Sequence, residues 1–317
     1  MFLSRKLISM VTKLKVDLAP AAKRDLVLQN PIMPASGTFS WGFEFAKHFD
    51  INLLGAIVSK GVTLLPRLGN TQPRAVETPA GMLNSIGLQN VGLDKIIHEI
   101  APKWEKLNLP IIVNIAGETE NEFIELAEIL GNMNGIDALE LNISCPNVDS
   151  GLEFGQDIEG AASITRATVR RSEVPVIVKL TPNVSDARSI AKACEDEGAA
   201  AICAVNTVLG LSIDSETRQP VLQRGTGGLS GPAIKPIALR IVYEVASTVK
   251  IPVIGCGGIT TGIDALEFLM AGATAVQIGT ASFSNPRATL DILFELTEWL
   301  NANNIADVND IIGCAQQ

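Results

Sequence analysis

The chain has 317 residues and a formal net charge of -9, and 47% of its residues are hydrophobic whereas only 4% are aromatic. The acidic balance argues against nucleic acid as a partner, because contact with a phosphate backbone requires clustered cations. The length suits one α/β barrel or two smaller domains, and an aliphatic core is typical of parallel strands that are buried on both faces.

Residues 1–16 place apolar side chains at helical spacing between basic ones. This pattern is compatible with a basic amphipathic helix at a membrane surface or on a partner protein. We favour a simpler interpretation, in which residues 1–15 are an extension without fixed structure and residues 16–317 form one domain. The stretch lacks the unbroken apolar core of a signal peptide, so we expect no stable insertion into a membrane.

From residue 31 onward one pattern repeats: a short apolar strand, a polar or glycine-rich end, and then a helical segment. We predict eight strands, over residues 31–36, 55–60, 110–116, 138–144, 175–181, 200–207, 252–258 and 275–280. Helices are predicted over residues 119–130, 157–171, 185–197, 232–249, 262–271 and 286–301. Eight strands alternating with helices, without a linker between them, predict a single (β/α)8 TIM barrel. A doubly wound sheet is the weaker alternative.

Barrel enzymes build their active sites at the carboxyl ends of the strands. In this chain those ends carry polar residues and glycines: Ser36, Lys60, Asn114, Asn142, Lys179, Asn206, Thr207, Gly257, Gly258, Gly279 and Thr280. Three connections, 61–88, 146–156 and 208–231, are too long for simple turns. We expect these long connections to cover or contact a ligand.

The fourth predicted strand ends in a cysteine. Apolar and polar residues alternate from Leu139 to Ser144, which indicates a strand, and Pro146 stops it. Cys145 therefore lies at the mouth of the predicted barrel. Taken alone, a free cysteine is more often a packing residue than a reactive one. A thiol is still a possible general base, because its ordinary pKa of about 8.5 needs only modest tuning.

The remaining cysteines and the histidines limit the available chemistry. The cysteines show no CxxC spacing, so we expect reduced thiols in a cytoplasmic protein. The only histidines, His48 and His98, are isolated in the sequence and cannot assemble a histidine-based metal site. Acid–base chemistry must then use Cys, Lys, Asp, Glu or a hydroxyl group.

Glycines follow the seventh and eighth predicted strands, where barrels commonly bind a phosphate group. A phosphorylated substrate or FMN would satisfy such a site, whereas the GxGxxG fingerprint for NAD is missing from the first strand–helix turn. Lys60 and Lys179 could be Schiff-base nucleophiles or fixed cations beside an anionic ring. Asn84, Asn142 and Asn206 offer donors and acceptors that suit amide or imide edges.

Five motifs together resemble the dihydroorotate dehydrogenase family. They are NPIMPASGTF at 30–39, ETPAGMLNSIGLQN at 77–90, ELNISCPN at 140–147, Asn206-Thr207 and TGGLSGPAIKP at 226–236. The resemblance covers about residues 16–313, and a cysteine at the base position is a class 1 feature. The segments at 77–84 and 151–155 are more similar to class 1B catalytic subunits than to the fumarate-linked class 1A.

The resemblance implies a set of site residues. FMN would be contacted by Ser36, Lys60, Gly61, Asn114, Asn142, Lys179, Val205, Gly231, Gly257, Gly258, Gly279 and Thr280. Dihydroorotate would be held by Lys60, Asn84, Ser85, Ile86, Gly87, Leu88, Asn142, Asn206 and Thr207. Cys145 would remove the C5 proton while C6 delivers hydride to the flavin, and Lys179 would stabilise negative charge on the reduced flavin.

The resemblance also implies partners. Class 1B enzymes oxidise dihydroorotate to orotate in pyrimidine biosynthesis and pair the catalytic chain with an electron-transfer subunit that carries FAD and an iron–sulfur cluster. NAD is the terminal acceptor, and the catalytic chain is expected as a homodimer within a heterotetramer.

Other functions are left open by the residues alone. A phosphate-binding barrel lyase or isomerase that uses Lys179 or Lys60 would explain the glycines but not the three asparagines. A non-catalytic barrel gives no reason for polar strand ends. Within the family, a class 1A-like fumarate-linked oxidase is the alternative.

Overall fold

The computed structural model describes residues 12–143 and 154–316, and its centre is an eight-stranded parallel sheet. The strands of this sheet are β3 (Ile32–Pro34), β4 (Ile57–Val58), β7 (Ile111–Ile115), β8 (Ala138–Asn142), β9 (Val176–Leu180), β10 (Ala201–Ala204), β15 (Val253–Cys256) and β16 (Ala275–Ile278). They follow the order β3-β16-β15-β10-β9-β8-β7-β4. All eight lie within the ranges predicted from the sequence, and the TIM-barrel prediction is confirmed.

The barrel closes between β3 and β4. The Gly55 N–H, just before β4, donates to the carbonyl of Ile32 at 2.8 Å. A Cβ atom at position 55 would lie 2.1 Å from the Asn30 carbonyl oxygen, so only glycine lets the two segments approach this closely.

The strand register shows which side chains point into the barrel. Directly paired residues of neighbouring strands share a face of the sheet. The register pairs Asn114 with Glu140 and Asn142 with Lys179, and it pairs Lys179 in turn with Cys203. These polar side chains therefore lie on the inner face, although the strands that carry them are otherwise apolar and buried.

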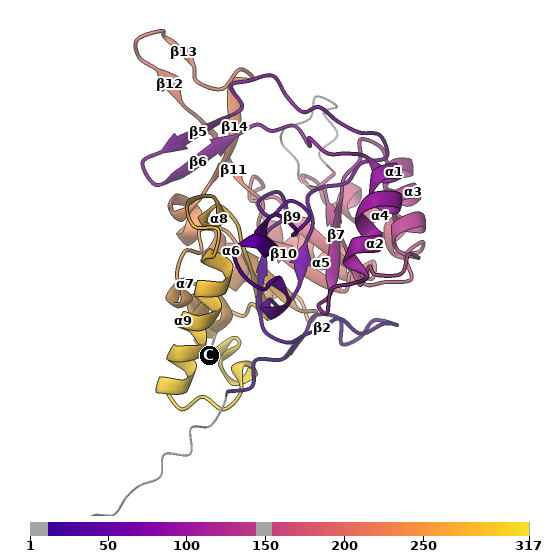
Figure 1. Ribbon diagram of the computed structural model, residues 1–317, viewed down its shortest axis with the longest axis vertical. Helices are drawn as coiled ribbons and strands as arrows, with labels where there is room; N and C mark the ends of the chain where they lie inside the picture. The colour runs from indigo at the N-terminus through magenta and orange to yellow at the C-terminus, as the bar shows by residue number, and fades with distance from the viewer. Residues whose placement is uncertain (1–11, 144–153, 317) are drawn as a thin grey trace, which may run out of the picture.

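Helices surround the barrel (Figure 1). The longer ones are α3 (Glu120–Leu130), α4 (Ile158–Val169), α5 (Ala187–Asp196), α6 (Lys235–Ala246), α7 (Gly262–Met270) and α9 (Ala288–Ala302). Each begins near its predicted start, and side chains of Thr119, Asp157, Asp186 and Thr261 cap α3, α4, α5 and α7. A composite helical segment made of α1 (Leu93–Lys95), the π-helical η3 (Ile96–Ile100) and α2 (Ala101–Trp104) lies between β6 (Gly81–Asn84) and β7, and α8 (Ala281–Ser284) follows β16.

Short elements complete the fold. A two-stranded sheet of β1 (Val16–Asp17) and β2 (Val27–Leu28) lies at the end of the molecule opposite β5 and β6 (Figure 1). The 3-10 helices are η1 (Phe45–Lys47), η2 (Ile51–Leu53), η4 (Pro232–Ile234), η5 (Val308–Ile311) and η6 (Cys314–Gln316). The Thr12 hydroxyl donates to Asn301 and to the Ile305 carbonyl, which ties the start of the described chain to α9. Within the described residues, no helix is long and apolar enough to cross a membrane.

A second, antiparallel sheet stands at the carboxyl ends of the barrel strands (Figure 1). We call it the outer sheet; its strands are β5 (Ala75–Thr78), β6 (Gly81–Asn84), β14 (Thr226–Ser230) and β11 (Val208–Leu211), in the order β11-β14-β6-β5. The hairpin of β12 (Ile213–Asp214) and β13 (Gln219–Pro220) extends beyond it. The connections 61–88 and 208–231 are therefore not plain loops, because all four strands of this sheet are built from them.

Candidate active site

A cavity of about 360 Å³ opens at the carboxyl ends of the barrel strands. It brings together nearly all the site residues that the sequence singled out: Ser36, Lys60, Gly61, Asn84, Ile86, Gly87, Leu88, Asn114, Asn142, Lys179, Val205, Asn206, Thr207, Gly231, Gly257, Gly258, Gly279 and Thr280. Ser85 differs, because it is fully buried behind the wall and its N–H donates to the Arg74 carbonyl. Cys145 lies outside the described residues.

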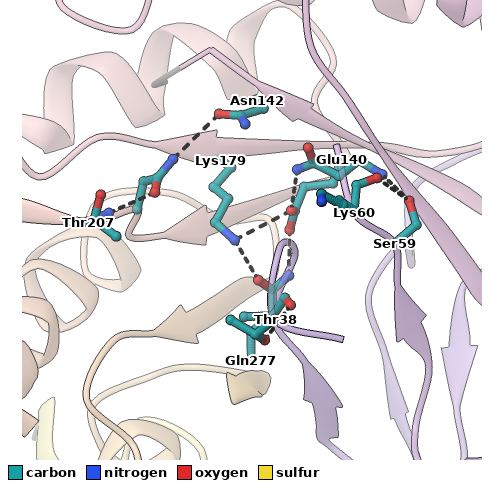
Figure 2. A network of polar contacts seen from close by, with 11 residues as sticks. Thr38, Ser59, Lys60, Glu140, Asn142, Lys179, Thr207 and Gln277 are labelled. Carbon is teal, nitrogen blue, oxygen red and sulfur yellow. Dashed lines mark hydrogen bonds and ion pairs between the residues drawn. The ribbon is translucent and has the colours of Figure 1, made fainter. Parts of the chain in front are cut away.

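Four buried side chains form what we call the cavity floor: Asn114, Glu140, Lys179 and Gln277 (Figure 2 shows the contacts among Glu140, Lys179 and Gln277). The Lys179 Nζ donates to Gln277 Oε1 at 2.8 Å and lies 3.5 Å from Glu140 Oε1. The same Glu140 oxygen accepts from Asn114 Nδ2 at 2.7 Å, and Glu140 Oε2 accepts from Gln277 Nε2. The floor is thus a donor–acceptor network around one buried ion pair.

The charge of Lys179 is set by its neighbours. Burial has the largest effect and lowers the pKa of Lys179, but the carboxylate of Glu140, helped by Cys203 and Cys256, raises it well above the usual value. Lys179 therefore carries a proton. Lys60, the other lysine of the cavity, has a pKa that is lowered, first by burial and then by the positive charge of Arg74.

One acceptor on the floor has no partner in the described structure. Asn114 Oδ1 is buried and accepts no hydrogen bond, whereas Nδ2 of the same amide is held by Glu140. A Cβ atom at Gly61 would lie 3.0 Å from Asn114 Oδ1, so the glycine keeps the space in front of this acceptor clear. The floor therefore presents both a fixed cation, Lys179, and a free acceptor, Asn114 Oδ1, to the cavity.

The loop after β15 is shaped to bind an anion. Gly257 and Gly258 have φ angles of +134° and +76°, and a Cβ atom at Gly258 would lie 2.7 Å from the Lys235 backbone nitrogen. In the part of the chain that the structure describes, the backbone N–H groups of Gly257, Gly258 and Thr280 donate no hydrogen bond. Free N–H groups of this kind are the usual ligands of a phosphate.

The end of this loop is anchored to α6 and α7. Asp264 Oδ2 accepts from the backbone N–H groups of Thr260 and Thr261, while Lys235 pairs with Asp264 Oδ1. Burial, the largest influence, raises the pKa of Asp264, but the hydrogen bonds from Lys235 and Thr260 bring it down to about 2. Asp264 is therefore a carboxylate at neutral pH, so its contacts with Lys235, Thr260 and Thr261 stay formed there.

The rim opposite the loop is made of amides. Asn206 Nδ2 donates to Asn142 Oδ1 at 3.5 Å, and Asn206 Oδ1 accepts from the Thr207 backbone N–H at 2.8 Å (Figure 2). Asn183, which the sequence did not single out, donates to the Thr207 carbonyl and accepts from the Leu209 N–H. The three predicted rim residues therefore come from β8 and from the connection that follows β10.

The outer sheet supplies the last wall. Asn84 pairs with Gly228 in the register, and the following segment is held by Asn70, whose N–H donates to the Ile86 carbonyl and whose Nδ2 donates to the Ser85 carbonyl. Arg74 donates to Gln89 Oε1 and to the Leu68 carbonyl. The segment 84–89 is thereby fixed by backbone and side-chain bonds over the cavity.

Sequence reasoning missed Glu140 and Gln277. Glu140 was counted only among the polar residues that alternate along the fourth predicted strand, and Gln277 was given no role. A polar residue inside a strand of an all-parallel sheet is the signal that could have found them, because both faces of such a strand are buried. Cys256 and Phe283 also line the cavity without having been predicted there. No group of three potential metal ligands occurs within the described residues.

Comparisons with known proteins agree with this geometry. A family model described as dihydroorotate dehydrogenase matches residues 22–300. The chain is 52% identical, over 92% of its length and 96% of the relative, to a dihydroorotate dehydrogenase B (NAD(+)) catalytic subunit of Trichlorobacter lovleyi. It is 51% identical to proteins of the same name from Citrifermentans bemidjiense, over 91% of this chain and 95% of the relative, and from Geobacter sulfurreducens, over 92% and 96%.

A solved structure is similar in fold. The dihydroorotate dehydrogenase of Eimeria tenella, in complex with ferulenol, superposes with a TM-score of 0.79 at 23% identity and covers 100% of this chain and 91% of its own. At this identity the likeness concerns the barrel architecture alone.

Proposed function

Since this chain belongs to the dihydroorotate dehydrogenase family, we propose that it is the catalytic subunit of an NAD-linked enzyme that oxidises dihydroorotate to orotate in pyrimidine biosynthesis. The observation that carries the proposal is the match along nine-tenths of the chain to relatives of that name, together with a cavity of the right chemistry at the barrel mouth.

The cavity residues fit FMN. The unpartnered Asn114 Oδ1 and the ammonium of Lys179 match a ring edge that offers both a donor and an acceptor, and the free N–H groups of Gly257, Gly258 and Thr280 match a phosphate. Ser36, Lys60, Gly61, Val205, Gly231 and Gly279 complete the proposed FMN site. When bound, FMN supplies the two-electron acceptor that the reaction needs.

Dihydroorotate, in this proposal, lies between the amide rim and the outer sheet. Asn84, Asn142, Asn206 and Thr207 offer hydrogen-bond partners to its amide and imide groups, and Lys60 offers a cation to its carboxylate. Ile86, Gly87 and Leu88 supply the adjoining wall, and Ser85 supports them from behind. Cys145, which follows β8, is the proposed base that takes the C5 proton.

The alternative lyase or isomerase is disfavoured by the floor in the form that uses Lys179. A Schiff-base nucleophile must be an uncharged amine, whereas Lys179 is paired with Glu140 and its pKa is raised. A fumarate-linked oxidase is not favoured either, because the curated relatives described above are named as NAD-linked catalytic subunits.

We further propose an electron-transfer partner subunit with FAD and an iron–sulfur cluster, a homodimer of this chain within a heterotetramer, and a cytoplasmic location. The name "catalytic subunit" of the relatives supports a partner. The direct test is spectroscopic: purified protein should carry a yellow flavin chromophore that dihydroorotate bleaches, and a folded, colourless preparation would contradict the proposal.

The acceptor is tested separately. NAD, fumarate and quinone are compared with and without the candidate partner subunit. We expect NAD reduction only when the partner is present, whereas fumarate reduction by the isolated chain would support the class 1A-like alternative.

A further inference from the structure

Glu140 is the hub of the cavity floor. It is fully buried in β8, and its two carboxylate oxygens receive hydrogen bonds or an ion pair from Asn114, Lys179 and Gln277, which come from β7, β9 and β16 (Figure 2). Glu140 does not line the cavity itself, so its effect on a bound molecule must be exerted through these neighbours.

We propose that Glu140 is a positioning residue that keeps Lys179 charged and fixes the amide of Asn114 so that its oxygen faces the cavity. The inference deepens the proposed function, on which it rests for the identity of FMN as the bound group.

The network leaves only one arrangement of its amide groups. A carboxylate only accepts hydrogen bonds and an ammonium only donates them. Gln277 touches both, so its Nε2 must face Glu140 and its Oε1 must face Lys179. By the same reasoning Asn114 must turn Nδ2 to Glu140, which leaves Oδ1 free for a donor in the cavity.

The same contacts explain the charge of Lys179. An ammonium buried without a counter-charge tends to lose its proton, because desolvation disfavours the charged form. The groups that face Lys179 are Glu140 from β8, Cys203 from β10, Cys256 from β15 and the uncharged Gln277 from β16. Glu140 is the only carboxylate among them. Gln277 holds Lys179 in place but cannot supply the charge.

The test measures FMN affinity from pH 6 to pH 9 for wild type, Glu140→Gln, Lys179→Met and the double variant. Flavin-free protein is titrated into FMN, and binding is read from the quenching of flavin fluorescence. In Glu140→Gln we expect Lys179 to lose its proton within this range, so that affinity falls about tenfold or more toward pH 9, the equivalent of one charged hydrogen bond. The affinity of Lys179→Met should be low at every pH, and the double variant should show no fall toward pH 9, because no ammonium is left to lose its proton.

A matched control removes a carboxylate elsewhere. Glu197→Gln breaks an ion pair with Arg166 on the helical surface and should leave the pH profile of FMN affinity unchanged. A wild-type profile in Glu140→Gln, or a fall in affinity toward pH 9 that persists in the double variant, would overturn the proposal.

A second measurement needs no FMN and so separates this inference from the proposed function. Without Glu140, the pKa of Lys179 in the folded state lies below its unfolded value of about 10.4, so the folded state gains stability as pH rises toward that value. The urea midpoint of Glu140→Gln should therefore approach that of wild type between pH 7 and pH 10, and a constant gap would contradict the inference. If wild-type protein binds no FMN, the proposed function fails while this readout still applies.

Failure to fold is also informative. If Glu140→Gln does not fold whereas Glu140→Leu combined with Lys179→Met does, the unpaired ammonium is the cause, as the proposal requires, because an apolar pair can replace a buried ion pair. If neither folds, Glu140 serves the barrel core and the proposal is wrong.

Discussion

The cavity floor and the outer sheet bound the same cavity but are held together in different ways. The floor consists of side chains whose positions follow from the register of parallel strands, and every polar contact on it is buried. The outer sheet joins two connections that are far apart in sequence, through backbone pairing of β6 with β14. We infer that the floor controls charge and cofactor chemistry, whereas the outer sheet controls the fit of the substrate.

The largest effect is expected from Cys145→Ala, in the segment that follows β8. Loss of a general base should lower kcat for dihydroorotate oxidation by about 10²–10⁴-fold. FMN content should stay at the wild-type level. The measurement is stopped-flow bleaching of the flavin with Cys314→Ala, an exposed thiol, as control; an unchanged rate would remove Cys145 from the mechanism.

The outer sheet is tested by Gly228→Val. A Cβ atom at position 228 would lie 2.0 Å from Thr207 Oγ1, so the side chain must push Thr207 away from the rim. We expect the KM for dihydroorotate to rise about tenfold, which corresponds to one lost hydrogen bond, with FMN still bound. Leu209→Ala, in the neighbouring strand at a half-exposed position, is the control. Loss of FMN instead would show that the two regions are not separable.

The smallest effect concerns the loop anchor. Asp264→Asn removes the charge that holds Lys235 and Thr260, and should cost about 1 kcal/mol of unfolding free energy at neutral pH. Because the folded-state pKa of Asp264 lies near 2, below its ordinary value of 3.8, its contribution is present above pH 4 and is lost as pH falls toward 2. Urea unfolding of both proteins from pH 7 to pH 2 should show the gap closing; a gap that widens in acid would contradict this assignment.

The two regions also differ in how well the sequence predicted them. The eight barrel strands were found because each is a short apolar run that ends in polar residues, and the rim asparagines follow from those ends. The outer sheet was predicted only as long connections. Two of the five residues of β14 are glycines, and β6 is a four-residue strand that pairs with a segment more than 140 residues away, so no local pattern marks them.

The roles of the floor residues could be predicted only in part. Lys179 and Asn114 were expected at strand ends, but their orientation depends on Glu140, whose contacts arise from three different strands. Such contacts depend on the register between strands. A single sequence does not contain the register, although it does contain the polar residues that the register brings together.

The floor network joins residues that are far apart in the sequence, and this separation determines when the network can form during synthesis. Glu140 and Gln277 are 137 residues apart, and Gln277 lies on β16, the last barrel strand to be synthesised. A growing chain that has emerged only through β9 already contains the carboxylate and the ammonium, but not the amide that bridges them. We therefore expect cofactor retention to begin only when synthesis has passed residue 278, so that ribosome-bound chains truncated before β16 release FMN that the complete chain keeps.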